Sequence, residues 1–231
     1  MYQSSRQESK FITSYLNLRS FIGILGVALP PVLIFGDGLF FEAGGIRPTI
    51  SDYYYSGMGD VFVGVLWAIS IFLFSFVGRN ILEALLGVLT GLSGLGVALI
   101  PCESGGCWVE HPGNPLDGHL VSAALFFILL GAFSFKVFPQ SDRGQDKLPR
   151  GEVAFYKICG LVIWALLVIT AVTIYWCPGF MHDTPLILGL ETAMVLIFGW
   201  SWMWKGDTYT RGKHLVMRLP GLGGKQGGRR K

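Results

Sequence analysis

The sequence predicts an all-α protein, a polytopic bundle of six transmembrane helices with both termini in the cytoplasm. Hydrophobic residues make up 52% of the 231 residues and charged residues only 14%, whereas soluble domains carry about 25% charged residues. The apolar residues also fall into nearly uncharged blocks of roughly 18 to 20 residues, the length that crosses a hydrocarbon core of about 30 Å as a helix. Finally, the basic residues gather on one side of these blocks, as the cytoplasmic loops of membrane proteins require.

The first three expected spans lie in the N-terminal half of the chain. Residues 20–37 form an apolar block behind a polar leader, and the lack of a cleavage site after it favours an uncleaved span over a signal peptide. Residues 61–78 contain no charged side chain. Residues 81–101 include the glycine pair Gly87 and Gly91, whose spacing allows close packing of membrane helices.

The last three expected spans cover residues 119–136, 155–176 and 185–204. The fourth begins at His119, and the sixth contains Glu191 within otherwise uncharged apolar sequence. We assign residues 1–205 to a single transmembrane domain and residues 206–231 to a flexible, basic cytoplasmic tail.

The orientation of the bundle follows from the lysines and arginines. With the N-terminus in the cytoplasm, all of the 18 basic residues except Arg47 fall on the cytoplasmic side. This asymmetry supports the orientation and the even number of spans. The net charge of +3 therefore reports topology, and we expect membrane lipids and no nucleic acid among the partners.

Four polar residues on or near the outer face are candidates for chemistry: Asp52, Asp60, His119 and Glu191. A carboxylate at the depth of Glu191 costs roughly 2.5–3.5 kcal/mol on insertion scales. Glu191 is therefore either a proton relay, ligand anchor or general acid–base, or a hydrogen-bonded packing residue. Asp60 has a structural role available as the N-cap of the second span, and we expect Asp52 to reach toward His119.

The outer histidines and cysteines allow two further predictions. His111, His119 and His182 are suitable zinc ligands that lie on the same side of the membrane, although no closely spaced pair fixes two of them on one helix. The alternative is a structural or interfacial role for each histidine. Cys102, Cys107 and Cys177 lie in the outer loops, where an oxidising compartment favours a disulfide, and any pairing leaves one of the three unpaired.

Several stretches together resemble known membrane proteins. T-I-S-D-Y-Y-Y with D-V-F-V-G-V-L-W-A-I-S-I-F-L-F, G-H-L-V-S-A-A-L-F-F and L-E-T-A-M-V-L-I-F-G-W-S-W-M-W-K-G resemble a group of uncharacterised six-span proteins of the bacterial inner membrane. The resemblance implies that location and a six-helix fold. The I-S-D motif is also similar to the DRAM type of six-span protein, whose members are linked to lipid handling. The placement of Ser, Asp and His is similar to that in ceramidase and progestin-receptor-like membrane hydrolases, but the paired histidines of their last span have no counterpart here.

Three functions are compatible with these features. The first is a protein that interacts with lipids or small molecules through a polar pocket on the outer face, built from the first outer loop, His119 and Glu191. The second is an intramembrane, metal-dependent lipid hydrolase. The third is a proton-coupled small-molecule carrier that uses Glu191. Whether the protein is an enzyme is left open at this point.

Overall fold

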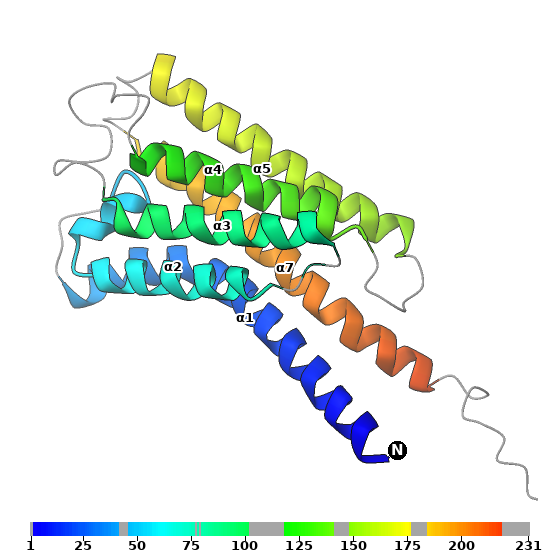
Figure 1. Ribbon diagram of the computed structural model, residues 1–231. Helices are drawn as coiled ribbons and strands as arrows, with labels where there is room; N and C mark the ends of the chain where they lie inside the picture. Colours follow the sequence, from blue (N-terminus) through cyan, green and yellow to red (C-terminus); the bar gives the residue numbers. More distant parts are fainter. Residues whose placement is uncertain are drawn as a thin grey trace, which may run out of the picture.

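The computed structural model describes most of the chain as helix (Figure 1). The described residues are 2–41, 46–76, 78, 80–101, 118–140, 148–176 and 184–218, and in 2–19 and 206–218 the helical backbone alone. In chain order, the helices are α1 (Tyr2–Phe40), the short 3-10 helix η1 (Ser51–Tyr55), α2 (Gly59–Phe74), α3 (Ile81–Leu99), α4 (Gly118–Ala132) with its π-helical continuation η2 (Phe133–Val137), α5 (Arg150–Trp176) and α7 (Leu186–Arg218). Within the described ranges there is no strand, so the all-α prediction is confirmed.

Five of the helices are long and apolar enough to cross a membrane. They contain the segments Ser20–Phe40, Ile81–Leu99, Gly118–Val137, Arg150–Trp176 and Leu186–Lys205. The remaining predicted span, residues 61–78, corresponds to the apolar helix α2, which has only 16 residues. The described helices therefore include five candidate spans of a multi-pass membrane protein and a shorter sixth apolar helix.

The helices form a ring in which neighbours in the chain are neighbours in space. α1 packs against α2, α2 against α3, α3 against α4, α4 against α5 and α5 against α7, and α7 closes the ring against α1. The N-terminal end of α1 and the C-terminal end of α7 protrude from the same end of the bundle (Figure 1). We call this the tail end, and the opposite end, which carries η1, the η1 end.

Small residues let neighbouring helices in this ring approach closely. A Cβ atom on Gly199 of α7 would lie 2.8 Å from the carbonyl oxygen of Gly23 on α1. On α3, a Cβ atom on Gly87 would lie 2.9 Å from the carbonyl oxygen of Leu73, and one on Gly91 the same distance from that of Ser70. The prediction that Gly87 and Gly91 allow close packing is therefore confirmed, and the partner is α2.

The helix α2 ends four residues before the end of its predicted span because the chain must turn there into α3. The Ser75 N–H donates to the carbonyl oxygen of Ile71 at 3.1 Å, and the Asn80 side chain then caps α3 by accepting from the Glu83 N–H at 3.0 Å. The apolar Phe76, whose N–H donates to the Leu73 carbonyl oxygen at 3.1 Å, belongs to this turn. Apolar character alone does not distinguish such a turn from a helix.

Aromatic side chains fill the bundle toward the tail end. Trp202 is fully buried, with its ring centroid 5.0 Å from that of Phe138, 5.2 Å from that of Phe198 and 5.4 Å from that of Phe133. Nearby, the Lys205 ammonium donates to the carbonyl oxygen of Gln140 at 2.8 Å. This cluster joins α7 to η2, so the tail end of the bundle is closed by packing.

The first and last helices both extend beyond their predicted spans. α1 begins at Tyr2, well before residue 20, and α7 continues to Arg218, past the boundary at residue 205 that we set for the membrane domain. The predicted flexible tail therefore begins with helix, and residues 219–231 lie outside the described part of the chain.

Candidate functional site

Residues 46–58 form a plug at the η1 end of the ring. The carbonyl oxygen of Pro48 accepts a hydrogen bond from the Leu188 N–H at 2.8 Å, in the first turn of α7. The Arg47 Nε lies 3.7 Å from the Asp37 Oδ2, at the end of α1, and Asp37 is 2% exposed. The plug is thus attached to both helices that close the ring.

The turn that begins η1 is held by two hydrogen bonds between Thr49 and Asp52. The Thr49 hydroxyl donates to Asp52 Oδ2 at 2.9 Å, and the Thr49 Oγ1 accepts from the Asp52 N–H at 3.0 Å. Both side chains are buried. Next to them, burial raises the pKa of the Tyr53 phenol, and the nearby Asp37 carboxylate adds to this shift. Asp52 therefore has a structural role in shaping η1, and Tyr53 stays neutral.

Ser51 and His119 meet through a hydrogen bond between η1 and the start of α4. The Ser51 Oγ lies 2.9 Å from the His119 Nε2, and the His119 Nδ1 lies 2.6 Å from the carbonyl oxygen of Ile100. A carbonyl oxygen only accepts, so Nδ1 carries the proton. In the neutral imidazole, Nε2 is then an acceptor, and the Ser51 hydroxyl donates to it. The hydrogen bond to His119 that we expected from Asp52 comes here from its neighbour.

Glu191 reaches the same segment from α7. Its Oε2 accepts a hydrogen bond of 2.7 Å from the backbone N–H of Ile50. This bond joins residues 141 positions apart in the chain and fixes the backbone immediately before Ser51. Glu191 is therefore a hydrogen-bonded group at the junction of the plug and α7.

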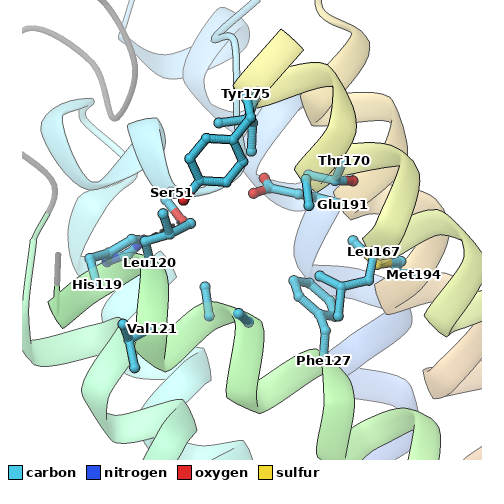
Figure 2. A pocket seen from close by; sticks show the side chains of 14 residues that line it. Ser51, His119, Leu120, Val121, Phe127, Leu167, Thr170, Tyr175, Glu191 and Met194 are labelled. Carbon is cyan, nitrogen blue, oxygen red and sulfur yellow. Dashed lines mark hydrogen bonds between the residues drawn. The ribbon is translucent and has the colours of Figure 1, made fainter. Parts of the chain in front are cut away.

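These polar groups border a cavity between α4, α5 and α7 (Figure 2). Its volume is about 190 Å³. Ser51, His119, Glu191, Thr170 and Tyr175 supply the polar atoms. The remaining lining side chains are apolar: Leu120, Val121, Ala123, Ala124, Phe127, Leu167, Ala171, Ile174 and Met194.

The cavity opens between α4 and α5. Val121 on α4 and Tyr175 on α5 both line it, and they are 46% and 45% exposed. Ala171, also in the lining, is exposed on α5 as well. The opening therefore faces the outside of the ring, where a membrane protein meets lipid.

A smaller cavity of about 40 Å³ lies further inside the ring. Ser51, Ala123, Phe127 and Glu191 border both cavities. The other lining residues of the smaller cavity are apolar side chains of α1, α2, α3, α4 and α7 together with Ile50. Ser51 and Glu191 thus stand between an accessible cavity and the packed interior.

The structure brings His119 and Glu191 to one cavity but not every predicted site residue. Asp52 bonds to Thr49 within its own turn. Asp60 is exposed in the first turn of α2 and does not line the cavity; the N-cap is Met58, so the N-cap role predicted for Asp60 is wrong. As a first-turn carboxylate, Asp60 still favours the positive end of the helix dipole.

The predicted zinc and disulfide sites fall largely outside the described residues. His111, His182, Cys102, Cys107 and Cys177 all belong to segments that the structure does not describe. Within the part that it describes, no three His, Cys, Asp or Glu side chains gather in a way that would hold a metal ion. The remaining zinc candidate, His119, uses Nδ1 for Ile100 and Nε2 for Ser51.

Sequence reasoning missed three parts of this site. Tyr175 stands beside Trp176 at the end of a span, where aromatic residues usually belong to the interfacial belt. Thr170 had no distinguishing pattern. The Ile100 carbonyl, which orients His119, is a backbone group and has no signature in the sequence.

In comparisons with protein-family models, curated proteins and solved structures, this chain has no match. The resemblances drawn from sequence motifs therefore stay predictions. What the site does must be argued from its geometry.

Proposed function

We propose that this is a six-span protein of the bacterial inner membrane that binds a neutral, single-chain lipid from the outer leaflet. The observation that carries the proposal is the cavity between α4, α5 and α7, which is polar at one end, apolar at the other and open toward the outside of the ring. An amphiphile has the same division between its head and its chain.

The polar-to-apolar order of the cavity matches the orientation of a lipid in the outer leaflet. Ser51, His119 and Tyr175 lie near the η1 end, whereas Phe127 and Met194 lie deeper along α4 and α7 (Figure 2). From His119 to Phe127 the helix rises about 12 Å. A head group at the membrane surface would therefore meet the hydroxyl and imidazole groups, and its chain would point toward the middle of the bilayer.

The volume limits how much of the lipid is enclosed. An apolar cavity of about 150 Å³ holds a molecule of the size of benzene, and this cavity is only slightly larger, at about 190 Å³. It accommodates the segment that joins head and chain. The rest of the chain would leave through the opening between α4 and α5 and remain in the bilayer.

The charges around the polar end favour a head group without charge. Glu191 lines the cavity, and none of the lining residues is a lysine or arginine, so an anionic head would find no cationic partner there. Arg47, the cation of the plug, is occupied by Asp37. Hydroxyl or amide N–H groups can instead donate to the Glu191 carboxylate and exchange hydrogen bonds with Tyr175.

Charge and helix packing support the membrane topology in this proposal. All basic residues except Arg47 would lie on the tail side, as expected if that side is cytoplasmic. α2 packs against α1 on one side and α3 on the other, as the other helices of the ring pack against their two neighbours. Its 16 residues span about 24 Å, and a bilayer adapts to such a short helix by local thinning.

Site-directed photocrosslinking tests the lipid-binding proposal. Dodecylglycerol with a diazirine in its alkyl chain is incorporated into nanodiscs with the full-length protein, irradiated, and mapped by peptide mass spectrometry. We expect saturable labelling of the facing walls, residues 118–127 of α4 and 167–175 of α5. Unlabelled dodecylglycerol should compete for it.

A matched pair of variants gives the control. Ala171 and Ala165 are both exposed alanines of α5, but only Ala171 lines the cavity. Ala171→Phe should fill the opening and reduce the labelling at least tenfold, while Ala165→Phe should leave it unchanged. Equal labelling in both variants, or labelling spread evenly over the outside of the helices, would refute the proposal.

A further inference from the structure

We propose that Ser51 and His119 form a nucleophile–base pair that hydrolyses the ester of a neutral monoacyl lipid held in the cavity. This inference rests on the proposed lipid-binding function and adds a reaction to it. It requires neither a metal ion nor a cofactor.

The hydrogen bonds of His119 give its ring the orientation that a general base needs. Its Nδ1–H is directed at the carbonyl oxygen of Ile100, at 2.6 Å, so the lone pair of Nε2 faces the Ser51 hydroxyl at 2.9 Å. In serine hydrolases a third group likewise holds the imidazole in the tautomer that accepts the serine proton. Here the backbone of the α3 terminus plays that part.

The serine is held as firmly as the histidine. Ser51 lies between Ile50, whose N–H donates to Glu191, and Asp52, whose N–H donates to Thr49. Positions on both sides of the nucleophile are therefore fixed by hydrogen bonds. Glu191 acts in this arrangement as a positioning residue, because it anchors the backbone that carries the Ser51 hydroxyl.

The cavity brings a substrate carbonyl to this pair. Ser51 and His119 both line it, and the Tyr175 phenol extends from α5 toward the space beside Ser51 (Figure 2). A phenolic O–H is a hydrogen-bond donor that can stabilise the oxyanion of a tetrahedral intermediate. The apolar walls would hold the acyl chain, and the opening between α4 and α5 would admit the substrate.

The reaction proceeds in two balanced steps. The Ser51 Oγ adds to the acyl carbonyl carbon while its proton passes to His119 Nε2; the bond from that carbon to the alcohol oxygen then breaks, and the alcohol leaves with the proton. In the second step, water adds to the acyl-serine and gives one proton to His119. The Ser51 oxygen departs with that proton, which yields one fatty acid and restores the hydroxyl.

Dodecyl fluorophosphonate tests the reactivity of Ser51 directly. The full-length protein in nanodiscs is treated with the probe, and the modified residue is identified by peptide mass spectrometry. An activated Ser51 should displace fluoride and retain the phosphonyl group. Release of lauric acid from glycerol monolaurate is followed in parallel.

Three variants separate a catalytic from a structural role. Ser51→Ala removes the nucleophile, and His119→Gln keeps an amide that can accept from Ser51 but cannot take its proton. Both should lower labelling and ester hydrolysis at least about 100-fold, the lower range of general-base catalysis. Ser122, one turn after Gly118 and hydrogen-bonded to its carbonyl oxygen, does not line the cavity, so Ser122→Ala should behave like the parent.

Binding of dodecylglycerol, an ether that cannot be hydrolysed, distinguishes the two proposals. Saturable dodecylglycerol binding by the parent protein without modification of Ser51 would overturn the hydrolase inference and leave the lipid-binding function standing. If the parent protein neither binds dodecylglycerol nor is modified at Ser51, both the lipid-binding function and the hydrolase inference are overturned. We expect the probe to modify Ser51 in the parent protein. We also expect the Ser51→Ala variant to retain dodecylglycerol binding.

Discussion

At the scale of single residues, the half-buried Glu191 has a hydrogen-bond partner that explains its position in an apolar helix. Its carboxyl group accepts the Ile50 N–H at 2.7 Å, and a buried N–H left without its acceptor costs about 1–3 kcal/mol. An acidic side chain among apolar residues of a membrane helix is expensive unless a donor meets it. The plug and α7 therefore depend on each other.

Replacement of Glu191 should separate its hydrogen bond from its charge. Glu191→Gln keeps a carbonyl oxygen for Ile50 and should change the free energy of unfolding by no more than about 1 kcal/mol, whereas Glu191→Leu leaves that N–H without its acceptor and should cost about 1–3 kcal/mol. Unfolding of the two variants in the same detergent measures the difference. Equal stabilities would show that the Ile50 bond contributes nothing.

The sequence was informative about some residues of the site and silent about others. His119 and Glu191 could be singled out because polar groups inside apolar segments are costly and therefore few. Their partners could not, since the Ile50 N–H and the Ile100 carbonyl are backbone groups whose availability depends on the fold. For the same reason the choice between Ser51 and Asp52 as the partner of His119 needed the geometry of η1.

At the scale of the helices, close approach between neighbours determines how the ring closes. The contact of α1 with α7 runs through Gly23 and Gly199, and without side chains at these positions the two backbones approach closely, as in many membrane helix pairs. On α2, by contrast, a Cβ atom added to Gly64 would meet no atom within 4 Å. A side chain at Gly199 would therefore collide with α1, whereas a side chain at Gly64 would meet open space.

Alanine at the two positions should act in opposite directions. Gly64→Ala should raise the free energy of unfolding by up to about 1 kcal/mol, because alanine is the better helix former. Gly199→Ala should lower it by about 1–3 kcal/mol through overpacking against the Gly23 carbonyl. Thermal unfolding of both variants in one detergent provides the comparison, and a stabilised Gly199→Ala would contradict the described α1–α7 contact.

Helix boundaries were predictable from the sequence only where hydropathy changes at the same place as the backbone. The span expected at 119–136 matches Gly118–Val137 within one residue at each end. The span expected at 61–78 does not match α2, because apolar residues continue into the turn before Asn80. Trp202 lies near the end of the sixth predicted span, where aromatic residues usually belong to the interfacial belt, but it is fully buried. Which face of its helix it occupies depends on the neighbouring helices.

At the scale of the whole molecule, the two ends of the ring differ in structure. Aromatic packing around Trp202 closes the tail end, whereas the other end carries the plug and the cavity. With the basic residues on the tail side, the cavity would face the outer leaflet.

Cysteine accessibility should report this orientation. In a chain whose four native cysteines are replaced by serine, Tyr55→Cys lies in the plug at an exposed position, and Gly151→Cys lies at the start of α5 with open space around it. A membrane-impermeant maleimide added to intact spheroplasts should label Tyr55→Cys alone, and both after lysis. Labelling of Gly151→Cys in intact spheroplasts would reverse the proposed topology.

The measurement that tests lipid binding in the cavity most directly is native mass spectrometry with dodecylglycerol. The parent protein and Ala165→Phe should each retain one copy of the lipid at saturation, and Ala171→Phe, with its cavity opening filled, should retain none. One retained copy in all three proteins, or several copies without saturation, would contradict the account.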